Sequence, residues 1–355
     1  MPTATHTSTI ALTDEPAALL DRLLTHVREE HQLELDRETD GTRSYEQGGM
    51  RIAFKAEATG LGISLSAPNA SQLIFIKEAI ANHLAEHDVE IAGNLRWTGE
   101  TAIVGTMPEN FRVMRIVARR TVFEGLERIT LHHPDVASFD PAQIQLRFML
   151  PLDRTIEPKW PEMGANGAPI WPSDGYALHA RYLTIRTLRP QACEIDVDVV
   201  RHLDGLISTW ASSAETGAEI GVMGPAGALV DTLPTPVVLA ADGTGVGHLA
   251  RLVEQLGTEG TGDVVIAAPT LADATAYLPE TPLTVHHIAP GQFESEIVER
   301  VRDLTSAKPP AYAFFAGEFE NAQALRQTFK RELGLGKTTQ LSVAYWRRGF
   351  SGYGE

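Results

Sequence analysis

Two segments with helically spaced apolar residues flank two strand-like segments early in the chain. Residues 14–27 open with two acidic residues and a proline and then repeat leucines along one face, which predicts a helix. Residues 51–58 and 62–67 read as strands that meet at a glycine turn. Asn69 stands where it would cap a second helix. This order of elements predicts a small α+β domain.

The pattern then becomes mostly strand-like, with a single helix after His202. Several short strands with one helix are typical of a small barrel. Residues 157–175 are rich in proline, glycine and tryptophan, which predicts a long loop between two strands. The strands are expected at residues 111–118, 127–133, 144–150, 180–188 and 194–200.

The last third of the chain alternates short apolar runs with amphipathic segments. This alternation is typical of a parallel sheet with crossover helices. The strands are expected at residues 237–241, 264–268, 283–288, 312–316 and 340–345. The helices are expected at residues 245–256, 271–277, 294–304 and 320–333.

Together the patterns predict a multidomain chain. A flexible, Thr- and Ser-rich tail over residues 1–13 precedes the small α+β domain over residues 14–98. An antiparallel β-barrel follows over residues 108–234. An α/β domain with a parallel sheet completes the chain over residues 235–355.

Composition narrows the choice of partners. The formal net charge of the 355-residue chain is −16, which argues against nucleic acid and anionic membrane surfaces. No apolar run is long enough for a transmembrane helix, and the N-terminus lacks the pattern of a signal peptide. The single cysteine, Cys193, cannot form an intramolecular disulfide or a cysteine-rich metal site. A reducing, cytoplasmic location is therefore expected.

The segment Arg181–Arg186 carries two arginines and a threonine on a strand pattern. Alternation places Arg181, Leu183 and Ile185 on one face, and Tyr182, Thr184 and Arg186 on the other. An arginine can clamp a phosphate with two hydrogen bonds. On spacing alone, however, a surface strand with solvated arginines is the commoner explanation.

Two further segments offer groups that suit phosphates. Ser208 and Thr209 stand at the start of a predicted helix, where backbone amides favour anions, although an ordinary helix cap explains them equally well. Residues 241–247 place Asp242, Thr244 and Gly245 between a strand and a helix, where glycines allow close approach of a phosphate. The spacing is not the full dinucleotide fingerprint, so a plain tight turn is the alternative.

No metal site is expected. The histidine pairs 132–133 and 286–287 lie on predicted strands, where adjacent side chains point to opposite faces and cannot bind one ion. Lys159, Arg347 and Arg348 are candidates for a basic patch, with a solvated C-terminal tail as the alternative for the two arginines.

The order of these motifs resembles the siderophore-interacting protein family of the ferredoxin-reductase superfamily, from about Arg112 to Gly349. The motifs are a cationic strand, a turn before a Ser-x-Trp-Ala helix, a Gly-Pro-x-Gly loop and a Tyr-Trp-Arg-Arg-Gly tail. They are carried by Arg181, Thr184, Arg186, His202, Ser208, Trp210, Ala211, Gly224, Pro225, Gly227 and the segment Tyr345 to Gly349.

The resemblance implies an FAD-dependent ferric-siderophore reductase. NAD(P)H would pass a hydride to FAD, and single electrons would then reduce the Fe(III)-siderophore and release Fe(II). Thr184 would be the catalytic residue, and a ferredoxin donor stays open. Lys159, Arg347 and Arg348 would meet the siderophore. The resemblance implies that the cofactors are bound by Arg181, Tyr182, Leu183, Thr184, Arg186, His202, Ser208, Thr209, Gly224, Gly227, Asp242, Thr244, Gly245, Gly317 and Glu318.

The chain departs from the family's pattern at two places. Leu183 stands where the family has the aromatic residue that packs on the flavin, and Tyr182 points to the opposite face. The turn after His202 is one residue shorter than the family's and lacks its proline. Two alternatives therefore stay open: a general NAD(P)H:flavin or quinone reductase on the same fold, and a non-catalytic siderophore-binding protein. The α+β domain resembles a small accessory domain found ahead of such reductases.

Overall fold

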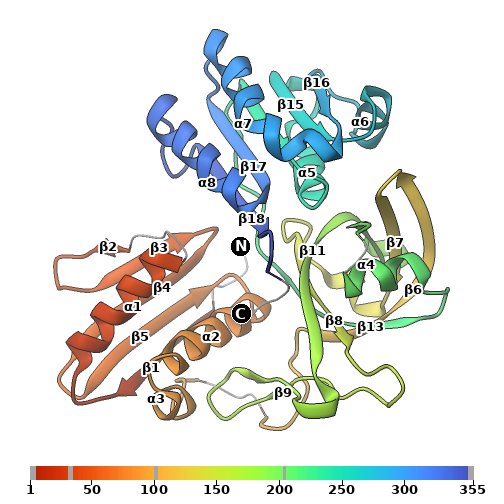
Figure 1. The fold of residues 1–355 in the computed structure, drawn as a ribbon. Helices are drawn as coiled ribbons and strands as arrows, with labels where there is room; N and C mark the ends of the chain where they lie inside the picture. The colour runs from red at the N-terminus through yellow and green to blue at the C-terminus, as the bar shows by residue number, and fades with distance from the viewer. Residues whose placement is uncertain (1–4, 31–34, 100–102, 203–204, 351–355) are drawn as a thin grey trace. The chain divides into compact units, whose positions relative to one another are not determined.

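The computed structural model describes residues 5–30, 35–99, 103–202 and 205–350 (Figure 1). The chain divides into two compact units. The first unit consists of residues 1–111, 151–178 and 224–227, and the second consists of residues 112–150, 179–223 and 228–355. The predicted domain boundaries stay predictions.

The N-terminal part of the first unit is an antiparallel sheet with two long helices on one face. Its five strands are arranged in the order β1-β5-β4-β3-β2. Leu61, Ile63 and Leu65 alternate along β5 and pack with the apolar faces of α1 and α2. The elements are β1 (Thr5–Leu12), α1 (Pro16–Glu30), β2 (Asp36–Arg37), β3 (Arg43–Gln47), β4 (Met50–Glu57), β5 (Gly60–Ala67), α2 (Ala70–Ala85) and α3 (Val89–Gly93). The α+β class is confirmed, as is the Asn69 cap, whose side chain accepts a hydrogen bond from the Gln72 amide at 3.0 Å.

The N-terminal tail is the first correction to the sequence analysis. Residues 5–12 form strand β1, which pairs antiparallel with β5, so the prediction of a flexible tail over residues 1–13 is wrong for this segment. Threonine is β-branched and favours strands. The buried Thr7 donates a hydrogen bond to the Thr98 carbonyl at 2.8 Å, and the buried Thr9 accepts one from the Arg96 amide at 3.2 Å. Residues 1–4 lie outside the described part of the chain.

The loop that was predicted at residues 157–175 belongs to the first unit. It contains the two-residue strands β9 (Glu162–Met163) and β10 (Pro169–Ile170), and a short 3-10 helix (Asp174–Tyr176) begins at its end. Two indoles fix it to the α+β part: Trp97 donates to the Asn166 carbonyl at 2.8 Å, and Trp171 donates to Glu78 at 2.7 Å. In the sequence, this insertion lies within the predicted barrel domain over residues 108–234.

A closed six-stranded barrel follows, in the order β11-β12-β7-β6-β13-β8. Its core is filled by inward-facing aliphatic and aromatic residues together with Trp210 of α4. The Gly224-Pro225 segment was predicted to be a loop, but it belongs to the sixth strand, β13. Buried residues on both sides of the segment continue the strand. The elements are β6 (Phe111–Phe123), β7 (Leu126–His132), β8 (Gln145–Pro151), β11 (Leu178–Arg189), β12 (Glu194–Val200), α4 (Leu206–Ser213) and β13 (Glu219–Ala226).

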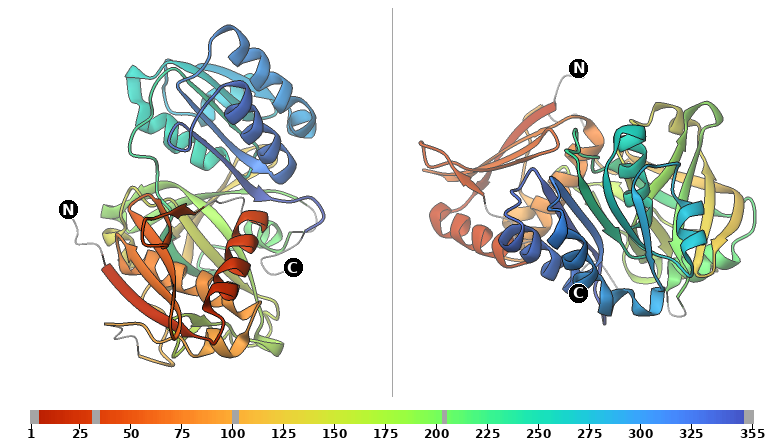
Figure 2. Two further views of the ribbon diagram at one scale, coloured as in Figure 1. Left: turned by 90° about the vertical axis from the view of Figure 1, so that its left-hand side faces the viewer. Right: turned by 90° about the horizontal axis from the view of Figure 1, so that it is seen from above.

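The rest of the second unit is a three-layer α/β/α domain, which confirms the predicted α/β class with a parallel sheet. All strand pairs are parallel, in the order β16-β15-β14-β17-β18. Helices α5 and α6 pack on one face of the sheet, and α7 and α8 pack on the other (Figure 2). The elements are β14 (Val237–Ala241), α5 (Val246–Leu256), β15 (Gly262–Ala267), α6 (Leu271–Tyr277), β16 (Thr284–Ile288), α7 (Pro290–Ala307), β17 (Tyr312–Glu318), α8 (Phe319–Gln327) and β18 (Gln340–Trp346).

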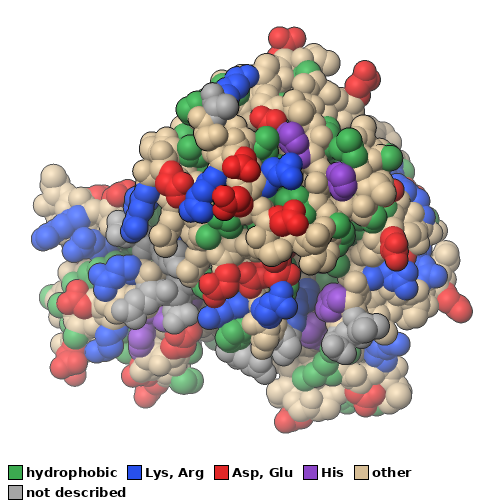
Figure 3. Space-filling model, turned by 45° about the horizontal axis from the view of Figure 1, so that its top comes forward, with side chains coloured by type: hydrophobic (Ala, Val, Ile, Leu, Met, Phe, Trp, Pro, Cys, Tyr) green, Lys and Arg blue, Asp and Glu red, His purple; other side chains and the backbone are tan. Residues whose placement is uncertain are grey.

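Charges of both signs are interspersed on the face drawn in Figure 3, despite the net charge of −16. Charged side chains of the second unit also form ion pairs, such as Arg302 with Glu332 at 2.9 Å. Among the helices in the described part of the chain, none combines the length and the apolar character that a membrane crossing requires.

Candidate functional site

The outward face of β11 and β8 carries the polar residues of the candidate site. On β11, Ile185 is fully buried in the barrel core and Leu183 packs against that core. Alternation therefore directs Tyr182 and Thr184 away from the core. On the neighbouring β8, Leu146 and Phe148 fill the core in the same way, so that Arg147 faces outward.

Thr184 lies at the centre of this face. Its side chain is only 6% exposed, and its hydroxyl oxygen is buried without a hydrogen bond of good geometry, although the Tyr345 hydroxyl lies near it. The first turn of α5 approaches closely, because a Cβ atom added at Gly247 would stand 3.4 Å from the Thr184 Cβ. A buried hydroxyl that lacks a well-aligned partner fits a ligand with a hydrogen-bonding edge.

A neutral histidine–tyrosine pair stands beside Thr184. The His248 Nδ1 and the Tyr345 hydroxyl are 2.9 Å apart, and the His248 ring packs against Phe314 with the ring centroids 4.7 Å apart. Burial, assisted by the charge of Arg251, lowers the pKa of His248 to about 3. Burial raises the pKa of Tyr345. Both groups are therefore uncharged at neutral pH and can supply hydrogen bonds without a net charge.

Tyr182 is paired with Arg147 on the same outward face. The Arg147 Nε donates to the Tyr182 hydroxyl at 3.0 Å, and the guanidinium lies 4.9 Å from the centre of the Tyr182 ring. Leu183, in contrast, packs on the barrel core. The aromatic group on the Thr184 side of the strand is thus Tyr182, held by a buried arginine.

Arg181 offers a positive charge that no acidic side chain in the described ranges neutralises. It is half-buried, and its guanidinium donates to the Ala180 carbonyl at 2.7 Å. Burial lowers the pKa of Arg181. The nearby His179 has its pKa lowered to about 4 by burial and by the charge of Arg181, so it stays neutral. An anionic group would compensate the buried charge of Arg181.

The Arg186 guanidinium, by contrast, already has an acidic partner within the protein. Its guanidinium pairs with Glu254 of α5 and lies 5.4 Å from the centre of the Tyr277 ring. Arg251 of α5 adds a second link between the barrel and the sheet domain by donating to the Ile185 carbonyl at 3.1 Å. Arg186 therefore holds β11 against α5.

At the start of α4, the side chain of Ser208 is hydrogen-bonded within the protein itself. Ser208 is the third residue of the helix and is buried, and its hydroxyl accepts from the His202 amide at 2.8 Å and donates to the His202 carbonyl at 3.1 Å. The Thr209 amide donates to the Gly205 carbonyl at 2.7 Å, as in any helix. The exposed His202 ring covers Gly205, where an added Cβ would lie 2.1 Å from it. Residues 203–204 of the shortened turn lie outside the described residues.

Gly224, Gly227 and Lys159 belong to the first unit. The Gly224 amide donates to the Asn110 carbonyl at 2.8 Å, and Gly227 has a positive φ of 62°. The Lys159 ammonium lies 3.9 Å from the centre of the Tyr176 ring. These contacts place Gly224 in the backbone hydrogen bonding of that unit and Lys159 on an aromatic surface.

The turn after β14 is organised by Asp242. One carboxylate oxygen accepts hydrogen bonds from the Thr244 amide at 2.8 Å, the Thr244 hydroxyl at 2.6 Å and the Gly245 amide at 3.3 Å. The other accepts from the Trp346 indole at 2.7 Å. Burial raises the pKa of Asp242 in spite of these hydrogen bonds. Asp242 and Thr244 thus shape the turn.

Gly317 and Glu318 lie at the carboxyl end of β17, next to this turn. A Cβ added at Gly245 would stand 2.5 Å from the Ala316 carbonyl oxygen, and one added at Gly317 would stand 2.6 Å from the Asp242 carboxylate. Both glycines are therefore required by the packing of the turn. Glu318 caps α8 by accepting from the Glu320 amide and also accepts from the Arg348 amide at 3.2 Å. Ligands of open parallel sheets bind at this edge.

The two arginines after β18 are both exposed, and they have different neighbours. Arg348 pairs with Glu294 of α7. The Arg347 guanidinium lies between two phenyl rings, 4.6 Å from the centre of Phe319 and 4.3 Å from that of Phe350. No ion pair involving Arg347 is found within the described residues.

The structure thus brings Thr184, Gly247, His248 and Tyr345 together from three separate segments. The sequence motifs point to Thr184, and they include Tyr345 only as part of the tail. His248 and Arg147 were not predicted. A histidine on the inner side of a helix and an arginine amid buried strand residues were the available signals, since buried polar residues need partners.

Comparisons with known proteins agree with this architecture. Residues 115–229 match the family model of the siderophore-interacting FAD-binding domain, and residues 234–349 match that of the siderophore-interacting protein. The ferric vibriobactin reductase ViuB of Vibrio cholerae is 25% identical over 248 residues, which are 67% of this chain and 90% of the relative. The ferric acinetobactin reductase of Acinetobacter baumannii is 28% identical over 190 residues, which are 51% of this chain and 64% of the relative.

The fold is also shared with a solved structure. The crystal structure of the siderophore-interacting protein SipS from Aeromonas hydrophila aligns with a TM-score of 0.55 and 22% identity. It covers 68% of this chain and 93% of that chain. The two family models together span residues 115–349. The chain therefore belongs, over this range, to the siderophore-interacting protein family, with a small α+β region ahead of it.

Proposed function

We propose that the protein is an FAD-dependent reductase of ferric siderophores that uses NAD(P)H as electron donor. The observation that carries the proposal is the buried Thr184 hydroxyl, which faces α5 and Tyr345 inside the region matched by the FAD-binding family model. The named relatives of Vibrio cholerae and Acinetobacter baumannii are ferric siderophore reductases. FAD, when bound, accepts a hydride from NAD(P)H and delivers single electrons to Fe(III), which oxygen chelators hold more tightly than Fe(II).

The residues of the second unit would divide the task of holding FAD. Thr184 would donate a hydrogen bond to the flavin edge, and the uncharged Tyr345–His248 pair would keep that edge in a neutral, water-poor setting. Tyr182, fixed by Arg147, would supply the aromatic contact that Leu183 cannot give. Arg181 would bind a phosphate of the cofactor.

Several other predicted cofactor residues would act by shaping the site. Arg186 would position β11 through its pair with Glu254. Ser208 would fix the His202 turn, which leaves the His202 ring, the Thr209 hydroxyl and the amides of the first helical turn for a pyrophosphate. In the sheet domain, the turn held by Asp242 and the adjoining Gly317-Glu318 segment would receive NAD(P)H, with Thr244 and Gly245 setting the backbone path. Gly224 and Gly227 stay candidates for cofactor contact on the basis of the family resemblance.

For the siderophore, Arg347 is the stronger candidate of the two terminal arginines. Arg348 already pairs with Glu294, whereas the charge of Arg347 lies between two phenyl rings and has no acidic partner among the described residues. An anionic ferric siderophore would meet both a cation and an aromatic surface there. Lys159, on the ring of Tyr176, offers the same combination in the first unit. A ferredoxin in place of NAD(P)H is a further donor to test, and we infer a cytoplasmic location.

The parts of the chain would have separate roles. Residues 108–234 would bind FAD, residues 235–355 would bind NAD(P)H, and residues 14–98 would form an accessory domain. The fold alone does not decide which electron acceptor is used. The acceptor therefore has to be tested directly, with ferric siderophores compared against free flavins and quinones.

The role of Thr184 can be tested with a matched pair of variants. Thr184→Val removes the hydroxyl and keeps the shape of the side chain, and Thr187→Val makes the same change elsewhere on β11. Purified proteins would be titrated with FAD and then reduced anaerobically by NAD(P)H in a stopped-flow spectrophotometer. Thr184→Val should weaken FAD binding or slow flavin reduction, and Thr187→Val should do neither. Wild-type behaviour of Thr184→Val would remove Thr184 from the site, and a wild-type protein that binds no FAD would favour a siderophore-binding protein.

A further inference from the structure

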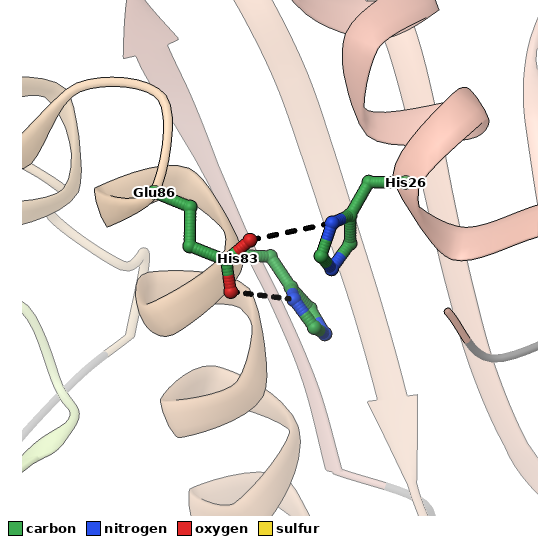
Figure 4. Close-up of side chains that lie close together, drawn as sticks. All are labelled: His26, His83 and Glu86. Atoms are coloured by element: carbon green, nitrogen blue, oxygen red, sulfur yellow. Dashed lines mark ion pairs between the residues drawn. The ribbon is translucent and has the colours of Figure 1, made fainter. Parts of the chain in front are cut away.

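We propose that His26, His83 and Glu86 form a binding site for a divalent transition-metal ion in the first unit. His26 comes from α1, and His83 and Glu86 come from the end of α2 and its C-cap. Their side chains point toward one another from the two helices (Figure 4). The ligand atoms of all three lie within 4.8 Å of one another. This site is separate in sequence from every residue assigned to the flavin reaction.

The spacing of the donor atoms suits a small cation. One carboxylate oxygen of Glu86 is 3.3 Å from the His26 Nδ1, and the other is 3.8 Å from the His83 Nδ1. A tetrahedral ion with bonds of about 2.0–2.2 Å holds its ligands about 3.3–3.6 Å apart. Small side-chain rotations would therefore bring the three donors to coordination distance.

Access and burial also fit a bound ion. The His26 and His83 side chains are 18% and 24% exposed, so their orientations are limited by packing between the helices. The Glu86 side chain is 52% exposed, which leaves one side of the cluster open to solvent. A site that is fixed on one side and open on the other allows an ion to enter and leaves room for water as a further ligand.

A fourth protein donor is close. His87 follows Glu86, and its ring centroid is 6.2 Å from that of His26. His83 lies in the last turn of α2, and Glu86 and His87 follow it by three and four residues in the turn at the end of the helix. The turn after α2 is tightened, because the His87 amide bonds to the Leu84 carbonyl at 3.0 Å. His87 would reach the ion by rotating its side chain.

The donor set decides the class of ion. Imidazole and carboxylate ligands suit Zn²⁺, Fe²⁺ and similar divalent ions, whereas Mg²⁺ and Ca²⁺ prefer all-oxygen sites. Without an ion, the same three groups form a cluster of histidine–carboxylate pairs, which is the competing explanation. Fe²⁺ is also the product of the proposed reductase, but the metal site does not depend on that proposal.

The experiment uses the full-length protein after treatment with EDTA and dialysis. Zn²⁺ is titrated by calorimetry, and Co²⁺ by its visible absorption, which reports nitrogen and oxygen ligands. One ion should bind per chain, with a rise in the melting temperature, and Mg²⁺ should not compete. His26→Ala, His83→Ala and Glu86→Gln should each weaken Zn²⁺ binding at least tenfold. His6→Ala, which removes an exposed histidine from β1, is the matched control and should bind like the wild type.

Two results would overturn the proposal. One is the absence of saturable Zn²⁺ binding to the folded wild-type protein. The other is binding that persists unchanged in the variants of His26 and His83, which would place the ion elsewhere. Circular dichroism of each metal-free variant shows whether it is folded. If a histidine variant is unstable, Glu86→Gln still gives a test, because it alters an exposed side chain at the end of a helix. None of these readouts uses the reductase activity.

Discussion

Replacing Arg181 by alanine should weaken FAD binding without destabilising the apo-protein. The guanidinium is half-buried and bonds only to the carbonyl of its neighbour Ala180 among the described residues. Burial lowers the pKa of Arg181, which means that the charged form is disfavoured where it stands. The substitution removes this uncompensated charge and breaks no ion pair. The apo-protein should therefore unfold at the wild-type temperature or slightly above it.

The loss of affinity follows from the strength of the missing contact. A hydrogen bond to a charged group contributes about 1.5–3 kcal/mol, which corresponds to about 10- to 150-fold in the dissociation constant of FAD. His179 supplies a second readout. Its pKa is lowered to about 4 by burial and then by the charge of Arg181, so it should rise in the variant, although burial keeps it below 6.5. An NMR titration of the apo-protein would measure this rise independently of the cofactor.

Arg186→Ala is the matched comparison on the same strand. Arg186 pairs with Glu254 and packs over Tyr277, so its loss should lower the melting temperature of the apo-protein. FAD would be titrated into both variants by fluorescence quenching, with thermal unfolding measured in parallel. An unchanged dissociation constant in Arg181→Ala, or a loss of stability as large as that of Arg186→Ala, would refute the reasoning.

Three further predictions concern the two units. Gly247→Val should lower FAD affinity in a folded protein, because the added side chain starts 3.4 Å from the Thr184 Cβ; wild-type affinity would contradict the placement. Stability should rise with pH between about 3 and 6.5, because His248 has a pKa of about 3 when folded and about 6.5 when unfolded, so the unfolded chain binds the extra proton. In urea unfolding, His248 should contribute up to about 1.4 kcal/mol per pH unit to the rise in the free energy of unfolding. A His248→Gln variant with the same pH dependence as the wild type would contradict this assignment. Trp171→Phe should cost about 1–3 kcal/mol, because the indole bonds to the buried Glu78 carboxylate, and equal urea midpoints would contradict this contact.

Regular hydrophobic periods made most of the fold predictable. The parallel sheet was anticipated because its strands alternate with amphipathic helices, and because the three central strands, β14, β15 and β17, are short and largely buried. Strand β1 was not predicted, because its inward residues include Thr7 and Thr9, whose burial depends on hydrogen bonds to residues 96–98. Such long-range partners leave no periodic signal in the segment itself.

The candidate site was predicted less completely than the fold. Alternation along β11 correctly separated Thr184 from Leu183, since the period of a strand is two. Spacing alone did not reveal that Asp242 and Ser208 use their side chains to hold turns. It also did not place His248 beside Tyr345, because the two are 97 residues apart. The cluster of His26 with His83 and Glu86 was missed for the same reason, since its donors come from two helices.

The central claim is that electrons pass from NAD(P)H through this protein to siderophore-bound iron. The most direct measurement is the anaerobic reduction of a ferric siderophore by the FAD-loaded protein and NAD(P)H, with Fe(II) trapped by ferrozine and the consumed nucleotide counted. The account predicts two Fe(II) for each NAD(P)H, because a hydride carries two electrons and each Fe(III) accepts one. Flavin that is reduced by NAD(P)H but yields no Fe(II) from any ferric siderophore, while it reduces quinones or free flavins, would contradict the claim.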